Sequence, residues 1–122
     1  MDNNNKVEYI GEDGSKIIFD PVTYYKIALS CIQKFGHKSR EESIKIIDSS
    51  SFFNKKKFPP RTYNEMALLD NELIYDIAMM VLYGDEYWNH PNYSKIGMDE
   101  YYEWENGLIR ENNLNQEYID YQ

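Results

Sequence analysis

The fold is decided by residues 62–84, TYNEMALLDNELIYDIAMMVLYG. Thr62 and Glu65 have the spacing of a capping box, in which two side chains satisfy backbone donors at the start of a helix. Apolar side chains then recur at helical spacing, at Met66, Leu68, Leu69, Leu73, Ile74, Ile77, Ala78, Val81 and Leu82. The pattern predicts a central helix that ends at Gly84, with residues 70–71 as a candidate break. Its apolar arc is wide, so we expect several elements to pack around it.

Two further helices are predicted upstream of this stretch. Asp20 followed by Pro21 is typical of a helix start, because Asp caps the first backbone donors and Pro suits the first helical position. The apolar face of this helix comprises Val22, Tyr25, Ala28, Leu29, Ile32 and Phe35. We expect Gly36 to end it in a left-handed conformation. A second capping box, at Ser39 and Glu42, predicts a short helix after it.

The remaining segments complete the predicted architecture. Residues 6–19 predict a β-hairpin, because β-branched and alternating residues flank an Asp-Gly turn signal. Residues 85–93 predict an aromatic and polar loop, and residues 98–113 an acidic helix. Residues 114–122 predict a polar tail.

A chain of 122 residues and 14.6 kDa has the size of one ordinary domain. Such a chain buries about two thirds of the surface that its unfolded form exposes, so it can fold without disulfides or a structural metal. We therefore predict a single domain over residues 1–122 with a mainly α fold. The helical part, residues 20–113, is expected to be a bundle of four to five helices, with the small hairpin 6–19 at its N-terminal edge and the polar tail 114–122 after it.

Several features predict a cytoplasmic location. The single cysteine, Cys31, cannot form an internal disulfide, and its apolar neighbours on a helix predict a buried core thiol rather than a nucleophile. The start, residues 1–5, lacks the basic and apolar regions of a secretion signal. The longest apolar run, residues 77–83, is seven residues long, whereas a membrane-spanning helix needs about 20.

Charge divides the chain into two unlike halves. The net charge is −8. Residues 1–61 hold 11 basic and 8 acidic side chains, a balance of +3, whereas residues 62–122 hold 2 basic and 13 acidic ones, a balance of −11. An acidic field repels phosphate backbones, which disfavours direct nucleic-acid binding. It also attracts a basic protein and speeds its association. The competing interpretation is that the acidity serves only solubility.

The chain has few of the residue types that bind metals, hold phosphates or act in catalysis. A zinc or iron site needs several Cys or His ligands, but the chain has one Cys and two His, His37 and His90. The six glycines are scattered, so no phosphate-binding loop is expected. We predict neither a metal nor a cofactor. Glu65, Glu72 and Asp76 could share a helix face as an acid and base set, which keeps a small carboxylate enzyme as one alternative; three such acids are more often a solvated stripe.

Aromatic residues are unusually abundant, with twelve tyrosines and two tryptophans. One cluster contains Tyr83, Tyr87, Trp88 and Tyr93 beside Asp85 and Glu86; another contains Tyr101, Tyr102 and Trp104 among Asp99, Glu100, Glu103 and Glu105. Tyr and Trp are enriched at protein interfaces, and carboxylates beside them pair with Lys and Arg. The mixture predicts recognition of a basic protein surface. Alternatively, about half of the rings belong to the core, with Tyr101 and Trp104 facing inward.

Residues 65–72 (EMALLDNE), with Tyr75, Ala78-Met79, Leu82-Tyr83-Gly84 and Tyr87-Trp88, resemble a pattern in small immunity proteins of bacterial contact-dependent growth-inhibition and related polymorphic-toxin systems. The resemblance implies a cytoplasmic antitoxin that binds one cognate toxin domain, often a nuclease, and occludes its active site. Contact residues vary widely in such families, so the resemblance assigns no individual residue.

We therefore expect a non-enzymatic protein that binds a cognate, basic toxin domain, with no nucleic acid, membrane or small molecule as a partner. The expected contact residues are Glu72, Asp76, Asp85, Glu86, Tyr87, Trp88, Glu100 and Glu103. The alternative is an acidic DNA-mimic or adaptor protein from a phage or mobile element, which would bind several DNA-binding proteins.

Overall fold

The computed structural model describes residues 6–122, so the expectations about residues 1–5 lie outside it. In chain order the elements are β1 (Val7–Ile10), β2 (Lys16–Phe19), α1 (Pro21–Phe35), α2 (Arg40–Ser49), α3 (Tyr63–Asp70), α4 (Ile74–Tyr83), the short 3₁₀-helix η1 (Tyr87–Asn89), α5 (Met98–Glu111) and β3 (Ile119–Tyr121). The predicted mainly α class is confirmed. Within the described residues, no helix is long and apolar enough to cross a membrane.

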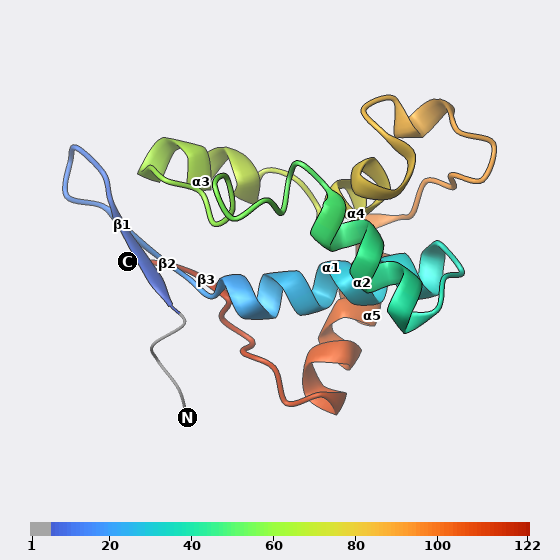
Figure 1. Ribbon diagram of the computed structural model, residues 1–122. Helices are drawn as coiled ribbons and strands as arrows, with labels where there is room; N and C mark the ends of the chain where they lie inside the picture. Colours follow the sequence, from blue (N-terminus) through green and yellow to red (C-terminus); the bar gives the residue numbers. More distant parts are fainter. Residues whose placement is uncertain (1–5) are drawn as a thin grey trace.

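Helix α1 runs through the middle of the molecule, with α3 on one side, α5 on the other and the sheet at its N-terminal end (Figure 1). Its start follows the prediction: the Asp20 carboxylate accepts hydrogen bonds from the backbone N–H groups of Val22 and Thr23. Its inward face includes Ile27, Ala28, Cys31 and Ile32, all fully buried. Cys31 is thus the core residue that the apolar pattern predicted.

The end of α1 differs from the prediction. Gly36 has φ −90°, not a left-handed conformation, and the left-handed residue is His37, with φ 55°. Glycine is required at position 36 for a different reason, which is close approach. A Cβ atom there would lie 2.6 Å from the carbonyl oxygen of Ile32 and 2.6 Å from Cδ2 of Leu82 in α4.

The predicted central helix over residues 62–84 is two helices, α3 and α4, so the candidate break at residues 70–71 is confirmed. Asp and Asn are weak helix formers, because their side chains compete for backbone hydrogen bonds. Leu73 then starts α4 with no side-chain cap. The break turns the chain between the two helices, and the central place in the core falls to α1, which packs against α4 and α2.

The sheet contains three antiparallel strands in the order β1-β2-β3. Its third strand lies in the segment that was predicted to be a polar tail, and that prediction is wrong for residues 119–121. Ile119 pairs with Phe19 and Tyr121 with Ile17, and Asp20 N–H donates to the Tyr118 carbonyl at 2.8 Å. A strand of three residues is too short for its sequence pattern to predict it. It forms because β2 has an unpaired edge with which it can hydrogen-bond.

Candidate partner-binding surface

An acidic cleft of about 450 Å³ lies where α3, α4 and the start of α5 meet. Three carboxylates line it: Asp70 ends α3, Glu72 lies in the break, and Asp76 is in the first turn of α4. Its other lining residues are Asn71, Leu73, Tyr93, Lys95, Ile96, Met98 and Tyr102. Lys95 is the one cation among these residues, so the cleft has a net negative charge.

The loop that forms one wall of the cleft is held in place by aromatic contacts. The Tyr75 hydroxyl donates a hydrogen bond to the Ser94 carbonyl. The ring of His90 stacks on Tyr83, with 4.0 Å between ring centroids. These contacts attach residues 90–94 to α4 and so position Tyr93 and Lys95 opposite the carboxylates.

Asp76 lies in a partly buried and negatively charged part of the cleft. Partial burial raises the pKa of its carboxyl, and the neighbouring negative charge of Glu72 raises it further. Hydrogen bonds from Tyr87 and Tyr93 and the charge of Lys95 act in the opposite direction. A desolvated carboxylate with tyrosine donors around it gains from a cationic partner, because an added positive charge offsets the cost of burial.

An apolar groove of about 390 Å³ adjoins the acidic cleft. Its walls come from the loop before α3 and from α3 and α4: Phe52, Lys57, Phe58, Pro60, Glu65, Leu68, Leu69, Glu72, Ile77 and Met80. Leu68 is 68% exposed, whereas Leu69 of the same helix is only 8% exposed. Glu72 lines both the groove and the cleft, so the two form one continuous surface.

A buried carboxylate lies on the inner side of the cleft. Glu105, in α5, is 4% exposed, and it accepts hydrogen bonds from the hydroxyls of Tyr101 at 2.7 Å and Tyr118 at 3.0 Å. Burial raises the pKa of this carboxyl, whereas the two hydrogen bonds lower it. No residue of the predicted contact set is this deeply buried.

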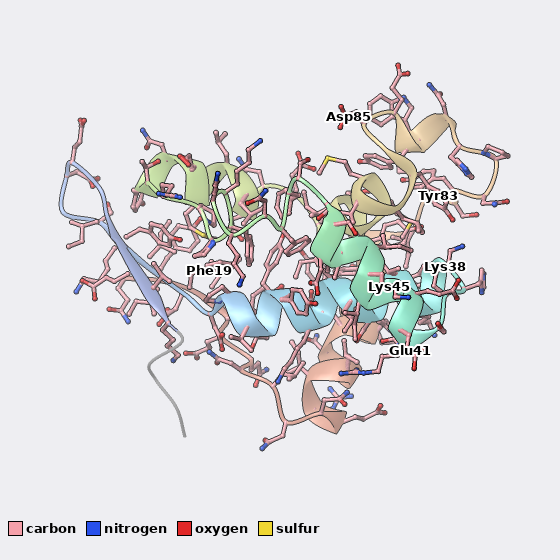
Figure 2. The ribbon with its side chains drawn as sticks, viewed as in Figure 1. Phe19, Lys38, Glu41, Lys45, Tyr83 and Asp85 are labelled. Carbon is pink, nitrogen blue, oxygen red and sulfur yellow. The ribbon has the colours of Figure 1, made fainter. Side chains whose placement is uncertain are left out.

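The structure brings some of the predicted contact residues together and separates others. Glu72 and Asp76 line the cleft, and Tyr87 contacts Asp76 from η1. Asp85, Glu86 and Trp88 are exposed at or near η1, beyond the end of α4, and Trp88 is 57% exposed. Figure 2 shows Asp85 at the outer edge of the molecule, beyond Tyr83.

Glu100 and Glu103 lie elsewhere. They line a separate shallow depression on α5 together with Trp104, Gly107, Leu108 and Glu111. Tyr101 is buried and Trp104 packs against Phe35, as expected if part of the aromatic cluster belongs to the core.

The expectation that Glu65, Glu72 and Asp76 could share a helix face is wrong. Glu65 belongs to α3 and lines the apolar groove, whereas Asp76 belongs to α4 and lines the acidic cleft. The break between the helices separates them. Within residues 6–122, no group of three or more His, Cys, Asp and Glu side chains is arranged to hold a metal ion.

Sequence reasoning missed Asp70, Tyr93 and Tyr102 as members of the cleft, and the apolar groove as a whole. The Asp-Asn pair that ends α3 was one available signal, since a helix break next to two acids exposes their side chains at a corner. Tyr102 belongs to the predicted aromatic cluster of Tyr101, Tyr102 and Trp104. The direction in which its side chain points depends on the rotation of α5 about its axis.

Comparison with known proteins identified no matching family model, no matching curated protein and no matching solved structure.

Proposed function

We propose that this protein is an immunity protein, an antitoxin that binds and neutralises a cognate, basic bacterial toxin domain, such as a nuclease, by occluding its active site. The observation that carries the proposal is the continuous surface formed by the apolar groove and the acidic cleft, which meet at Glu72. An apolar centre beside a charged region is the anatomy of a specific protein interface.

The chemistry of the two regions supports a protein as the ligand. The groove offers exposed apolar area at Leu68 and Met80, which an apolar side chain of a partner would remove from water. The cleft offers Asp70, Glu72 and Asp76 to Lys or Arg side chains. Specificity would come from the requirement that one partner satisfies both regions at once.

The aromatic turn extends this surface. Tyr87 links η1 to Asp76, and the exposed ring of Trp88 lies next to it in the same turn. Exposed aromatic rings are common anchors in interfaces. In this proposal the helices act as a bundle that holds the surface rigid, the hairpin 6–19 lies at its edge, and the contacts at Glu100 and Glu103 form a second, peripheral patch.

Co-expression with the C-terminal domain of the protein encoded immediately upstream tests the proposal. We expect growth of the host to be rescued and the two proteins to co-purify as a salt-sensitive complex. Glu72→Lys should weaken the complex by about tenfold or more, because it reverses a charge shared by both regions.

Glu41→Lys is the matched control, since Glu41 is an exposed acid of α2 that lines neither the groove nor the cleft. It should change the affinity much less than Glu72→Lys. Equal effects of the two variants would argue against this surface. Capture of several unrelated DNA-binding proteins in place of one toxin domain would favour the acidic mimic.

A further inference from the structure

A small cavity lies beneath the acidic cleft and shares Asp70, Glu72 and Tyr102 with it. Its volume is about 40 Å³, enough for two or three water-sized groups, since one such group needs roughly 10–15 Å³. Its inner wall has the side chains of Ile74 and Ile119 and four polar side chains from α1, α5 and the segment before β3: Tyr24, Tyr101, Glu105 and Tyr118. The cavity is therefore polar and opens toward the cleft.

Two polar atoms in this wall lack protein partners. The hydroxyls of Tyr101 and Tyr118 both donate to the same oxygen of Glu105, Oε1, and no donor within residues 6–122 reaches Oε2. The hydroxyl of Tyr24, a residue that is 1% exposed, has no hydrogen-bond partner in the described part of the chain either. Buried polar atoms in native proteins are nearly always paired, so the Tyr24 hydroxyl, the one fully buried polar side-chain atom without a partner in residues 6–122, indicates an occupant of the cavity.

The charge around the cavity favours a cation as that occupant. Asp70 and Glu72 stand at the mouth, Glu105 stands inside, and no Lys or Arg is among the lining residues. A buried carboxylate without a partner charge is costly, so it takes up a proton or binds a cation.

The size of the cavity distinguishes between cationic side chains. An ammonium group is about as large as a water molecule and has three donors, which matches Glu105 Oε2, the Tyr24 hydroxyl oxygen and one carboxylate at the mouth. A guanidinium group is planar and carries five donors in a fixed fork, so it needs a wider slot than about 40 Å³.

We propose that this cavity is a subsite for a primary ammonium group, the tip of one lysine side chain that a basic partner inserts between Asp70, Glu72 and Tyr102. The inference rests on the proposed function and names the residue type that the partner contributes. The methylene stem of that lysine lies in the acidic cleft against Leu73 and Tyr102, and its charge lies beside the buried carboxyl group of Glu105.

Titration of the isolated protein with lysine amide acetylated at Nα tests the subsite, with the Nα-acetylated amides of arginine and norleucine as comparison ligands, so that the side-chain tip is the only cationic group offered. NMR signals of the Glu105 carboxyl carbon and of the Tyr24 ring report binding. Lysine amide should give saturable shifts and bind at least about tenfold more tightly than either comparison ligand. Absence of saturable shifts with lysine amide would overturn the inference and leave an ordered water as the occupant.

Two conservative variants separate a binding role from a structural one. Glu105→Gln keeps an Oε1 acceptor for both tyrosines but removes the charge, and lysine amide binding should fall by about tenfold. Tyr24→Phe removes a hydroxyl that nothing in the described chain satisfies, so the variant should unfold no more easily than the wild type, yet bind lysine amide less tightly. Unchanged lysine amide binding in both variants contradicts the subsite.

Failure of the subsite and failure of the proposed function give different results. If Glu105→Gln leaves the affinity of the toxin complex unchanged and the protein does not bind lysine amide, only the subsite is overturned. Lysine amide binding without any toxin complex overturns the immunity proposal and retains the ammonium site.

Discussion

The carboxyl group of Glu105 is buried among tyrosine side chains. Its neighbours in the cavity are Tyr24, Tyr101 and Tyr118, and the buried Cys31 thiol lies close enough to feel its charge. Burial raises the pKa of Glu105 above that of an exposed glutamate, despite the hydrogen bonds from Tyr101 and Tyr118. The folded protein therefore keeps this proton at pH values where the unfolded chain has released it.

This shift predicts a pH dependence of stability. A group that binds its proton more tightly in the folded state makes the free energy of unfolding fall as pH rises. The fall should begin near pH 4.3, about the pKa of an unperturbed glutamate, and end above the raised pKa of Glu105. Stability contributed by this group is thus fully present below about pH 4.3 and is lost as pH rises through the raised pKa of Glu105.

Urea unfolding of the wild type and of Glu105→Gln as a function of pH measures the effect. The wild type should lose stability relative to the variant as pH rises through the raised pKa of Glu105. Asp76 also has a raised pKa and contributes a slope of the same sign to both proteins. Parallel curves for the two proteins would show that Glu105 does not titrate as expected.

At the scale of elements, the junction between α1 and α4 depends on Gly36. A methyl group at this position meets the Ile32 carbonyl oxygen at 2.6 Å, and this backbone atom cannot move aside without disturbing the last turn of α1. Leu82 of α4 is equally close, so the substitution also pushes on the helix that carries Asp76.

Gly36→Ala should lower the free energy of unfolding by about 1–3 kcal/mol, which is the usual cost of overpacking. Gly107→Ala is the control, because an added Cβ there meets only Nη2 of Arg110, at 3.9 Å, and alanine is favoured over glycine inside a helix such as α5. It should be neutral or slightly stabilising. Thermal unfolding of both variants measures the difference, and a similar loss in both would contradict the steric explanation.

The strand β3 connects the sheet to the candidate site. Tyr121 donates a hydrogen bond to Asp70 Oδ2 at 2.8 Å, and Tyr118, just before the strand, donates to Glu105. The C-terminal segment thereby holds one carboxylate at the mouth of the small cavity and another in its wall. This role was not visible in a segment that resembled a polar tail.

At the scale of the whole molecule, the two halves of the charge distribution have different consequences. The 13 acidic side chains of residues 62–122 create a field that speeds the approach of a basic partner, and salt screens it. The apolar groove contributes through area removed from water, which salt screens far less. The two regions of the surface should therefore respond differently to ionic strength.

Leu68→Ser separates these contributions. Because Leu68 is exposed, the change should cost little stability. It should weaken the toxin complex while leaving the dependence of its affinity on salt unchanged, whereas Glu72→Lys should flatten that dependence. Affinity measurements over a salt series check both expectations. An altered salt slope in Leu68→Ser, or an unaltered one in Glu72→Lys, would contradict this division.

Local signals predicted the starts of three helices because capping acts over only a few residues. Asp20, Ser39 and Thr62 each accept hydrogen bonds from backbone donors within the next three residues. Helical spacing of apolar residues identified the buried faces of α1 and α4 only in part. Ala28, Leu29 and Ile32 are buried as predicted, whereas Val22 is 38% exposed and the buried Tyr24 and Ile27 were missed. Of the three carboxylates of the cleft, Glu72 and Asp76 were predicted because they are only four residues apart, whereas Asp70 was not.

The sequence by itself determined the starts of three helices, the mainly α class, the buried place of Cys31 and the acidity of the second half, because each depends on composition or on neighbours along the chain. Only the tertiary structure decided that Asp70 meets Tyr121, 51 residues away, that Tyr118 meets Glu105, and that Phe58, Leu68 and Met80 form one groove. Such pairings depend on how α3, α4, α5 and β3 turn toward one another. That rotation is set by packing of the whole core around α1, which no short stretch of residues encodes.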